Sequence, residues 1–550
     1  MDLPFLRIPP FPGHRAGPLA RAGSRELLDF AAAAELVELL RKEQVGGSTW
    51  GARPDLAEGC LLLAPCSPEQ AREMVEIAQV EGQLDRCVML EPMSGSRNRV
   101  ARQMACLSGP VDPWHVVKAA AQIWAGADHE LALVAVLAKR PVRLFGQGCF
   151  AGCDTGDDGL VRMIQLAVGQ CAYHCPYDGT PISPAQAIAL LGTWRRQIDL
   201  NREISAVLGV AGWKRPTVDP LLWDGNSGPR HMRALARPGD DKTCVAVWKA
   251  RTPRAVLRQL EQSGIKQAEI EDGMIRGRGL GANCIPPLSV VVDLSGIYFD
   301  PSCTSDLELI LEAADMDDQL LERAARLRER IVAAGISKYG GDATPKRKPT
   351  GKREVLVVGQ VEDDRSILCG GDGQTNLELL VKTRSIEPDA WLIYRPHPDV
   401  EAGHRRGHIP DVCALRYANE GDRGGSISNL IESVDEVHCI TSLAGFEALL
   451  RGKSVTTHGV PFYAGWGVTR DLGMIPARRT RRRSLDELVA ATLILYPRYL
   501  DPVTRLPCPP EMLLERLESG MGSVTAPLAG VRMLQGKVKV ALRRLWKAAA

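Results

Sequence analysis

Four polar side chains that each follow an apolar run could form a site for a phosphate-bearing ligand. They are Asp363, Asp364, His397 and Ser442. Ser442 precedes a segment with helical spacing. A hydroxyl there lies beside unpaired backbone N–H groups and the positive end of the helix dipole, which is a phosphate-binding geometry. Glu447 shares the inward face of the same helix, where a carboxylate needs a partner that the hydroxyls of a nucleotide ribose would supply.

The apolar runs before these residues predict strands of one parallel sheet. They cover residues 354–360, 391–394 and 437–440, and helices are predicted at 376–385 and 443–451. Ligands of open α/β sheets bind where the strands end, so the loops after these strands should converge on one site. An acidic loop alone is commonly a solvated turn and a single histidine is commonly structural, but the convergence of several loops favours the functional interpretation.

Composition and charge exclude several classes of protein. A chain of 550 residues should hold about three or four domain-sized units, and 45% hydrophobic and 24% charged residues are typical of globular protein. The formal net charge of +2 gives no reason to expect nucleic acid as a partner. We expect neither a signal peptide nor a membrane span. The odd number of cysteines, fifteen, indicates reduced thiols in the cytoplasm.

Two pairs of cysteines leave two interpretations open. Cys149, Cys153, Cys171 and Cys175 could hold a structural zinc ion, with His174 as a substitute ligand. The spacing within each pair is looser than that of the usual zinc knuckle, which favours buried thiols.

The segments around these polar residues resemble the capsular polysaccharide β-Kdo transferases of the KpsC/LipB type. The matching segments are GQVEDDRSI, YRPHPDVEAG, TSLAGFEALLRGKSVTTHGVPFYAGWG and, earlier, IEDGMIRGRGLGANCIPPLSVVVDLSGIYFD. The resemblance implies an α/β, GT-B-like fold with two Rossmann-like lobes around a cleft. It further implies a retaining glycosyltransferase that moves Kdo from CMP-Kdo to a lipid-linked acceptor in Gram-negative capsule biosynthesis and export.

The resemblance also implies roles for single residues. Asp364 corresponds best to the nucleophile of a double displacement, and Asp363 is the alternative. Arg365 or Arg395 would keep this carboxylate ionised. The expected donor-binding residues are Gln360, Arg395, His397, Pro398, Thr441, Ser442 and Glu447. No metal is expected, and no cofactor apart from the donor substrate itself.

The acceptor side is assigned to the segment that begins at Glu271. Glu271 and Asp272 are candidate general bases for an acceptor hydroxyl. Arg276 and Arg278, in the glycine-rich segment that follows, are candidate acceptor-binding residues. The alternative is a loop whose arginines and carboxylates pair only with one another.

A weak internal repeat predicts a further Rossmann-like lobe near the start of the chain. Residues 128–152 align with residues 441–465 and share apolar and glycine positions with them. The functional residues are replaced: His129 stands in place of Ser442, Val134 in place of Glu447, and Leu90-Glu91-Pro92-Met93 in place of Arg-Pro-His-Pro. We therefore expect a degenerate lobe, retained for packing or for acceptor binding.

The predicted organisation has four parts. They are the degenerate lobe without catalytic motifs (1–200), an acceptor-side Rossmann-like lobe (201–345), a CMP-sugar-binding lobe (346–510) and a basic amphipathic tail (511–550). The tail could lie on the inner face of the inner membrane or pack on its own domain. Residues 305–334 are predicted as one long charged helix, and the basic run at 478–483 as a solvated turn.

The expected function is β-Kdo transfer by a cytoplasmic or peripheral membrane protein, with capsule assembly and export proteins as further partners. Two alternatives stay open. One is a transferase for another CMP-activated ulosonic acid, and the other is a non-catalytic assembly protein that binds capsule precursor. The contrast between intact and degenerate motifs within one chain argues against the second alternative.

Overall fold

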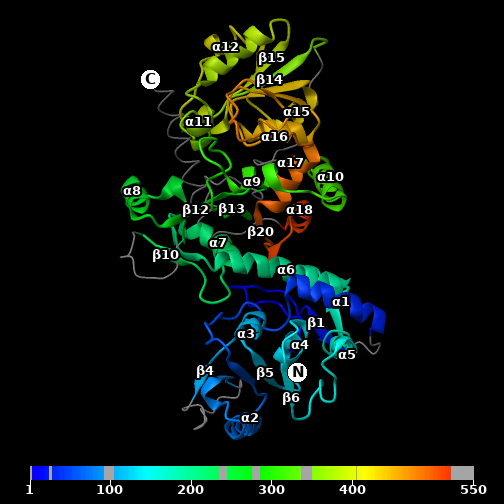
Figure 1. The fold of residues 1–550 in the computed structure, drawn as a ribbon. Coiled ribbons are helices and arrows are strands. Elements are labelled where there is room, and N and C mark those ends of the chain that lie inside the picture. Colours follow the sequence, from blue (N-terminus) through cyan, green and yellow to red (C-terminus); the bar gives the residue numbers. More distant parts are fainter. Residues whose placement is uncertain are drawn as a thin grey trace. The chain divides into compact units, whose positions relative to one another are not determined.

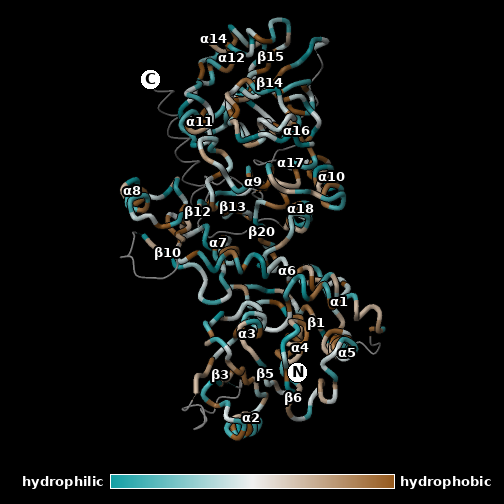
Figure 2. The backbone as a smooth tube through the Cα atoms, in the orientation of Figure 1, coloured by the Kyte–Doolittle hydropathy of each residue, from teal (hydrophilic) through white to brown (hydrophobic). Residues whose placement is uncertain are grey.

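The computed structural model of the chain describes residues 3–23, 28–91, 104–233, 244–275, 285–335, 350–403 and 405–521. The chain folds into two compact units (Figure 1). The first unit comprises Met1–Ile204 with Leu222–Pro229 and Val503–Leu506, and the second comprises the remainder. Both units are α/β, as predicted. Hydrophobic residues gather in the strands and on the helix faces that cover them, whereas the outer turns are hydrophilic (Figure 2).

The first unit contains a five-stranded parallel sheet in the order β4-β3-β2-β5-β6. Its strands are β2 (Leu61–Ala64), β3 (Cys87–Leu90), β4 (Ala105–Leu107), β5 (Gln122–Gly126) and β6 (Val142–Phe145). Helix α4 (Glu130–Leu137) is apolar on all sides after its first residue, and residues 131–137 are buried. The other helices are α1 (Phe30–Glu43), α2 (Pro68–Val80), α3 (Pro113–Ala119), α5 (Asp157–Ala167) and α6 (Pro184–Asn201), and a small sheet joins β1 (Ala20–Ala22), β7 (Cys171–His174) and β8 (Pro181–Ile182). The predicted additional Rossmann-like lobe is confirmed.

The second unit has two sheets, of which the first is mixed. Its order is β10-β9-β11-β12-β13-β20-β21, parallel from β10 to β12 and antiparallel beyond. The strands are β9 (Ile204–Leu208), β10 (Arg230–Met232), β11 (Cys244–Val247), β12 (Lys266–Asp272), β13 (Ser289–Asp293), β20 (Arg498–Leu500) and β21 (Pro507–Cys508). Strands β20 and β21 come from the segment predicted to belong to the lobe at 346–510, so the end of that segment returns to the neighbouring sheet.

The second sheet of this unit is wholly parallel, in the order β16-β15-β14-β17-β18-β19. Its strands are β14 (Glu354–Val358), β15 (Trp391–Arg395), β16 (Glu420–Gly421), β17 (Glu436–Cys439), β18 (Ser454–Thr457) and β19 (Arg470–Asp471). Helices alternate with them: α11 (Arg365–Gly370), α12 (Asn376–Ile386), α13 (Pro398–Glu401), α14 (Asp411–Ala414), α15 (Ile427–Ser433) and α16 (Leu443–Leu450). The strands predicted from the three apolar runs are confirmed to within a residue or two.

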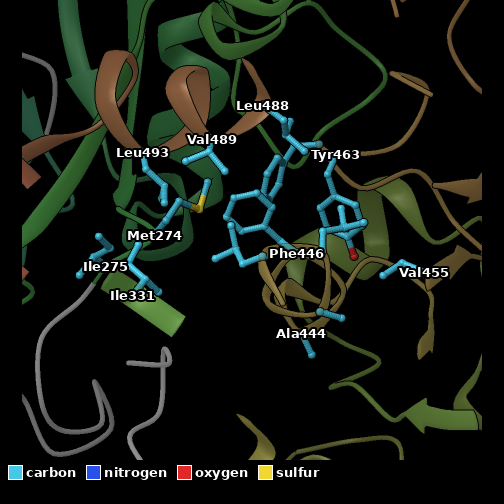
Figure 3. Close-up of a cluster of buried hydrophobic side chains, with 14 of the residues drawn as sticks. Met274, Ile275, Ile331, Ala444, Phe446, Val455, Tyr463, Leu488, Val489 and Leu493 are labelled. Atoms are coloured by element: carbon cyan, nitrogen blue, oxygen red, sulfur yellow. The ribbon is translucent and has the colours of Figure 1, made fainter. Parts of the chain in front are cut away.

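One apolar core connects the two sheets of the second unit. It contains Met274 after β12, Phe446 of α16, and Val489 of α17 (Leu485–Val489), which Figure 3 shows facing one another. Fully burying a side chain of the size of phenylalanine is worth roughly 2–3 kcal/mol. Since residues from both lobes share this core, the edges of the two sheets are held in a fixed relation.

Two local predictions are wrong. The predicted long helix at 305–334 is two helices, α9 (Asp306–Ala313) and α10 (Asp318–Ala333), because Ala314 is extended and Asp317 caps a new helix. The basic run at 478–483 is not a solvated turn: Arg478 and Arg479 both pair with Glu308 of α9. Within the described parts of the chain, every helix is too short or too polar to span a bilayer.

The remaining helices of the second unit complete its two lobes. They are α7 (Arg215–Leu221), α8 (Arg254–Ser263), a π-helical stretch (Ala490–Leu495) and α18 (Pro510–Glu518). Most of the predicted basic tail, from residue 522 on, lies outside the described residues.

Candidate active site

The hydroxyl cap predicted at the N-terminus of α16 is present. Ser442 caps the helix in an extended conformation, and its hydroxyl accepts a hydrogen bond from the backbone N–H of Ala444 at 3.2 Å. The hydroxyl of Tyr463 donates to the carbonyl of Ser442 at 2.5 Å. Gly445 makes this contact sterically feasible, since a Cβ there would lie 2.2 Å from the tyrosine oxygen. Glu447 is buried in the same helix, as expected.

Gln360 and Thr441, two predicted donor-binding residues, are engaged with each other. The backbone N–H of Thr441 donates to Gln360 Oε1 at 2.8 Å, and Gln360 Nε2 donates to Thr441 Oγ1 at 3.2 Å. Asn376 holds both the N–H and the carbonyl of Gln360. Both side chains are buried, so they fix the loops after β14 and β17 relative to one another.

Asp363 and Asp364 follow β14 at the same edge of the sheet. Asp364 caps α11, and its side chain accepts from the hydroxyl of Ser366 at 2.9 Å. Arg405 lies beside both carboxylates, with Nε 3.1 Å from Asp363 Oδ1 and Nη2 4.0 Å from Asp364 Oδ1. Burial alone would raise the pKa of Asp363, but the hydrogen bond and charge of Arg405 outweigh it and lower that pKa. Half of the Asp364 side chain, 52%, is exposed and accessible to a substrate.

The cations predicted to keep these carboxylates ionised have other partners. Arg365 pairs with Glu269 of β12, and Arg395 pairs with Asp422 at 2.7 Å. Arg395 also donates to the carbonyls of residues 424 and 425, so it holds that loop. The prediction that either one neutralises Asp364 is therefore wrong, and Arg405 has that position.

His397 caps the short helix α13, which begins at Pro398. Its Nδ1 accepts a hydrogen bond from the backbone N–H of Asp399 at 3.1 Å. An Nδ1 that accepts carries no proton, so the neutral ring has its N–H on Nε2. That N–H is a donor suited to a phosphate or a cytosine carbonyl.

The facing sheet contributes Glu271 and Asp272 at the end of β12. Lys214 Nζ lies 2.8 Å from Asp272 Oδ1. Desolvation and the charge of Asp272 raise the pKa of Glu271 to about 7, against the attraction of Lys214. A carboxyl group with such a pKa can take a proton from a substrate at neutral pH. Arg276 and Arg278, the predicted acceptor-binding residues, lie outside the described residues.

The ion pair between Arg365 and Glu269 brings the two edges together. Arg365 directly follows Asp364, and Glu269 precedes Glu271 by two residues in β12. Lys249 also pairs with Glu269, at 2.8 Å. The sequence motifs did not identify Lys214, Lys249, Arg405 or Tyr463. Single lysines and arginines in loops give no signal, and their partners are at least twenty residues away in the chain.

One group of described residues has the arrangement of metal ligands. The ligand atoms of Glu387, Glu436 and His438 all lie within 4.8 Å of one another. Glu436 begins β17, so the group is at the opposite edge of the sheet from the candidate site. Arg353 already pairs with both carboxylates, and we therefore assign no metal there. In the described part of the chain, the four cysteines considered for zinc do not form such a group.

The corresponding edge of the first unit is occupied by its own side chains. His129 caps α4 through Nδ1, which accepts from the N–H of Leu131 at 3.2 Å. Glu130 accepts from the N–H and hydroxyl of Ser48 and pairs with Arg7 at 2.7 Å. At the position where α16 has Ser442 this helix has His129, and the carboxylate of the next residue, Glu130, is already paired.

Several known proteins are similar to this chain in sequence. A family model described as capsule polysaccharide biosynthesis protein matches residues 243–499. Lipopolysaccharide-processing protein LpsZ of Rhizobium meliloti is 47% identical over 328 residues, which cover 57% of this chain and 74% of LpsZ. Capsule polysaccharide modification protein LipA of Neisseria meningitidis serogroup A is 38% identical over 399 residues. These cover 68% of this chain and 56% of LipA, so the chain spans little more than half of that relative.

A solved structure agrees with these matches. Thermosulfurimonas dismutans KpsC, beta Kdo 2,4 transferase, is similar with a TM-score of 0.50 and 29% identity, over 57% of this chain and 98% of that chain. The predicted fold class, a GT-B-like pair of Rossmann-like lobes preceded by a further such lobe, is confirmed.

Proposed function

The chain belongs to the capsule polysaccharide biosynthesis family of LpsZ and LipA, and on this premise we propose that it is a retaining transferase that moves Kdo from CMP-Kdo to a lipid-linked saccharide acceptor. The observation that carries the proposal is the meeting of two sheet edges. One presents the cap of α16 and the exposed carboxylate of Asp364, and the other presents Glu271. The KpsC structure is named a beta Kdo transferase, which supports Kdo as the transferred sugar.

The donor half of the reaction would use the parallel sheet. Ser442 and the N–H groups of α16 would bind the phosphate of CMP, and His397 Nε2–H would donate to the nucleotide. An oxygen of Asp364 would attack the anomeric carbon of Kdo as its bond to the CMP phosphate breaks, and CMP leaves with that electron pair. Arg405 lies beside this carboxylate, with Nη2 4.0 Å from Asp364 Oδ1.

The acceptor half would use the facing sheet. Glu271 would take the proton of an acceptor hydroxyl as the hydroxyl oxygen attacks the same anomeric carbon. The bond to Asp364 would then break and restore the carboxylate. Two inversions at one carbon give net retention.

The donor half of the reaction is tested by measuring the mass of the intact protein after exposure to CMP-Kdo without acceptor. We expect a gain of one Kdo residue in the wild type, with release of CMP, and loss of both in Asp364→Asn. Asparagine remains a good helix cap, so α11 should persist. The matched control is Asp363→Asn, which removes the neighbouring carboxylate and should retain the adduct.

Each other outcome has a defined meaning. Loss of the adduct only in Asp363→Asn would make that residue the nucleophile. If the protein forms the adduct with another CMP-linked ulosonic acid in preference to CMP-Kdo, that sugar nucleotide is the donor. Neither adduct nor CMP release from folded protein, with or without acceptor, would favour the non-catalytic assembly protein.

The protein would also interact with other proteins and with a membrane surface. Capsule assembly and export proteins are its proposed partners. The first part of the predicted tail, α18, packs in the core of the second unit, so the part from residue 522 on would associate with anionic lipid at the inner face of the inner membrane. The first lobe would then serve packing or acceptor binding without chemistry of its own. Flotation with anionic vesicles, compared for the full chain and a chain ending at residue 521, tests the membrane part.

A further inference from the structure

The helix α11, which Asp364 caps, contacts both lobes of the second unit. Its residue Ile367 is buried in the core of the parallel-sheet lobe, to which the helix belongs. The end of the helix lies against the mixed-sheet lobe, since a Cβ on Gly370 would be 3.5 Å from Pro301 Cδ. The position of the proposed nucleophile therefore depends on the lobe that carries the proposed base.

Two further side chains of α11 face the mixed-sheet lobe. Arg365 pairs with Glu269 of β12, and its guanidinium carbon lies 4.8 Å from the ring centroid of Phe299. Cys369, one turn later, lies beside Asp300: burial and that carboxylate raise the pKa of the thiol to about 11. A guanidinium held by a carboxylate and an aromatic ring of the same lobe is fixed in direction as well as in distance.

Glu269 has two cationic partners, one from each lobe. Its side chain is only 3% exposed, and Arg365 pairs with Oε1. Lys249, which follows β11 in the same lobe as Glu269, has its Nζ 2.8 Å from Oε2. A buried carboxylate requires compensation of its charge, and Lys249 provides that within the mixed-sheet lobe. The pair with Arg365 has a consequence that the pair with Lys249 lacks, because it connects α11 to β12.

The ion pair between the lobes fixes the spacing of the two proposed catalytic carboxylates. Asp364 directly precedes Arg365 in the chain. Glu271 follows Glu269 by two residues and so lies on the same face of β12, about 7 Å along the strand. The charge of Arg365 also reaches Glu271, where it opposes the desolvation and the charge of Asp272 that raise the pKa of that carboxyl group to about 7. The shared core holds the two sheets, whereas this pair holds the helix that carries the nucleophile.

We propose that Arg365 and Glu269 are positioning residues for the acceptor half of the reaction. Their ion pair would hold the Kdo bound to Asp364 within reach of the hydroxyl that Glu271 deprotonates. In that half the acceptor oxygen bonds to the anomeric carbon, the bond to Asp364 breaks with its electron pair returning to the carboxylate, and the hydroxyl proton passes to Glu271. The donor half uses only the parallel-sheet lobe and does not need the pair. This inference rests on the proposed transferase function and adds the contact that couples its two halves.

The test measures formation and discharge of the adduct separately, by intact mass, in Arg365→Gln and Glu269→Gln. The adduct forms with CMP-Kdo alone. Discharge is started by adding an alkyl glycoside of Kdo at a pH well above 7, where Glu271 is deprotonated. We expect formation at the wild-type rate and discharge slowed about 10- to 100-fold, as for a small misplacement of reacting groups. The adduct should therefore accumulate in both variants.

Two further variants separate positioning from charge compensation and from stability. Lys249→Gln removes the other cation from Glu269 without touching α11, so it should slow discharge far less than Arg365→Gln does. Arg323→Gln removes an ion pair with Glu511 that joins α10 to α18, and it should leave both steps unchanged. In the double variant Arg365→Gln/Glu269→Gln, discharge should be no slower than in the slower single variant, because each substitution removes the same interaction.

A purely structural role predicts a different pattern. Equal slowing of formation and discharge would show that the pair only stabilises the fold, and would overturn the proposal. Discharge at the wild-type rate in either single variant, or additive losses in the double variant, would overturn it as well.

Failure of the transferase function would be visible separately. A wild type that neither forms the adduct nor releases CMP would contradict that function, and one whose adduct the glycoside does not discharge would contradict only the choice of acceptor. In both cases hydrogen exchange of the α11 amides tests the ion pair. Faster exchange in Arg365→Gln and in Glu269→Gln, but not in Lys249→Gln, would support the positioning role. Exchange as in the wild type would reject it.

Discussion

At the scale of single residues, the environment of Glu271, the proposed base, would set the pH at which the proposed acceptor step runs. Desolvation and the charge of Asp272 raise the pKa of Glu271 from its ordinary 4.5 to about 7. A base acts only when deprotonated, so the acceptor kcat/KM should rise with pH and level off above about 7. Asp272→Asn removes the repelling charge and frees Lys214 to attract Glu271, so the midpoint should move to lower pH.

Rates of transfer and of adduct formation measured across the pH range check this prediction. Adduct formation involves no acceptor hydroxyl and should lack the rise near pH 7. Asp300→Asn, at another partly buried aspartate of the same lobe, is the control and should leave the midpoint unchanged. A midpoint that stays constant in Asp272→Asn would show that another group is the base.

Prediction from sequence was most successful where a residue's role depends on its neighbours in the chain. Ser442, Asp364 and His397 cap the helices that directly follow their strands, and a cap is a local property. The partners of these residues depend on the tertiary fold. Arg405 approaches Asp363 from more than forty residues away, and the pairing of Arg365 with Glu269 spans two lobes. Sequence spacing does not predict contacts between residues so far apart in the chain, which is why Arg365 or Arg395, and not Arg405, was predicted to lie beside Asp364.

At the scale of elements, the first turn of α16 depends on the absence of a side chain at Gly445. A Cβ there would lie 2.2 Å from Tyr463 Oη and 2.9 Å from Cys439 Sγ. Gly445→Ala should therefore lower the free energy of unfolding by about 1–3 kcal/mol, the usual cost of overpacking, and weaken CMP binding. Urea denaturation measures the first effect, and calorimetric titration with CMP measures the second.

The double variant shows whether the tyrosine hydroxyl is the obstacle. Tyr463→Phe alone should cost about 1 kcal/mol, because it removes the hydrogen bond to the carbonyl of Ser442. In Gly445→Ala/Tyr463→Phe the closest clash, with the hydroxyl at 2.2 Å, is gone and only the contacts at 2.9 Å with Cζ of the ring and with Cys439 Sγ remain, so the combined loss should be less than the sum. Additive losses would mean that the two residues act independently.

At the scale of the whole molecule, two Rossmann-like lobes of similar design differ in what their helix ends can bind. The helix α16 presents a serine, whereas the N-terminus of α4 has Glu130 in its first turn, already paired with Arg7 and hydrogen-bonded to Ser48. A carboxylate at that position repels a phosphate. The two lobes therefore predict one nucleotide site in each chain rather than two.

Calorimetric titration with CMP should give a stoichiometry of one, and Ser442→Asp should abolish binding. Aspartate is as good a helix cap as serine, so α16 should form while its new charge excludes the phosphate. The matched control is Ser67→Asp, which adds the same charge to the cap of α2 in the first lobe and should leave CMP binding intact. Two equivalents of CMP, or one equivalent that survives Ser442→Asp, would locate a nucleotide site outside α16. In that case the first lobe, whose strand order matches that of the second parallel sheet, would be inferred to bind nucleotide and not only to pack against the rest of the chain.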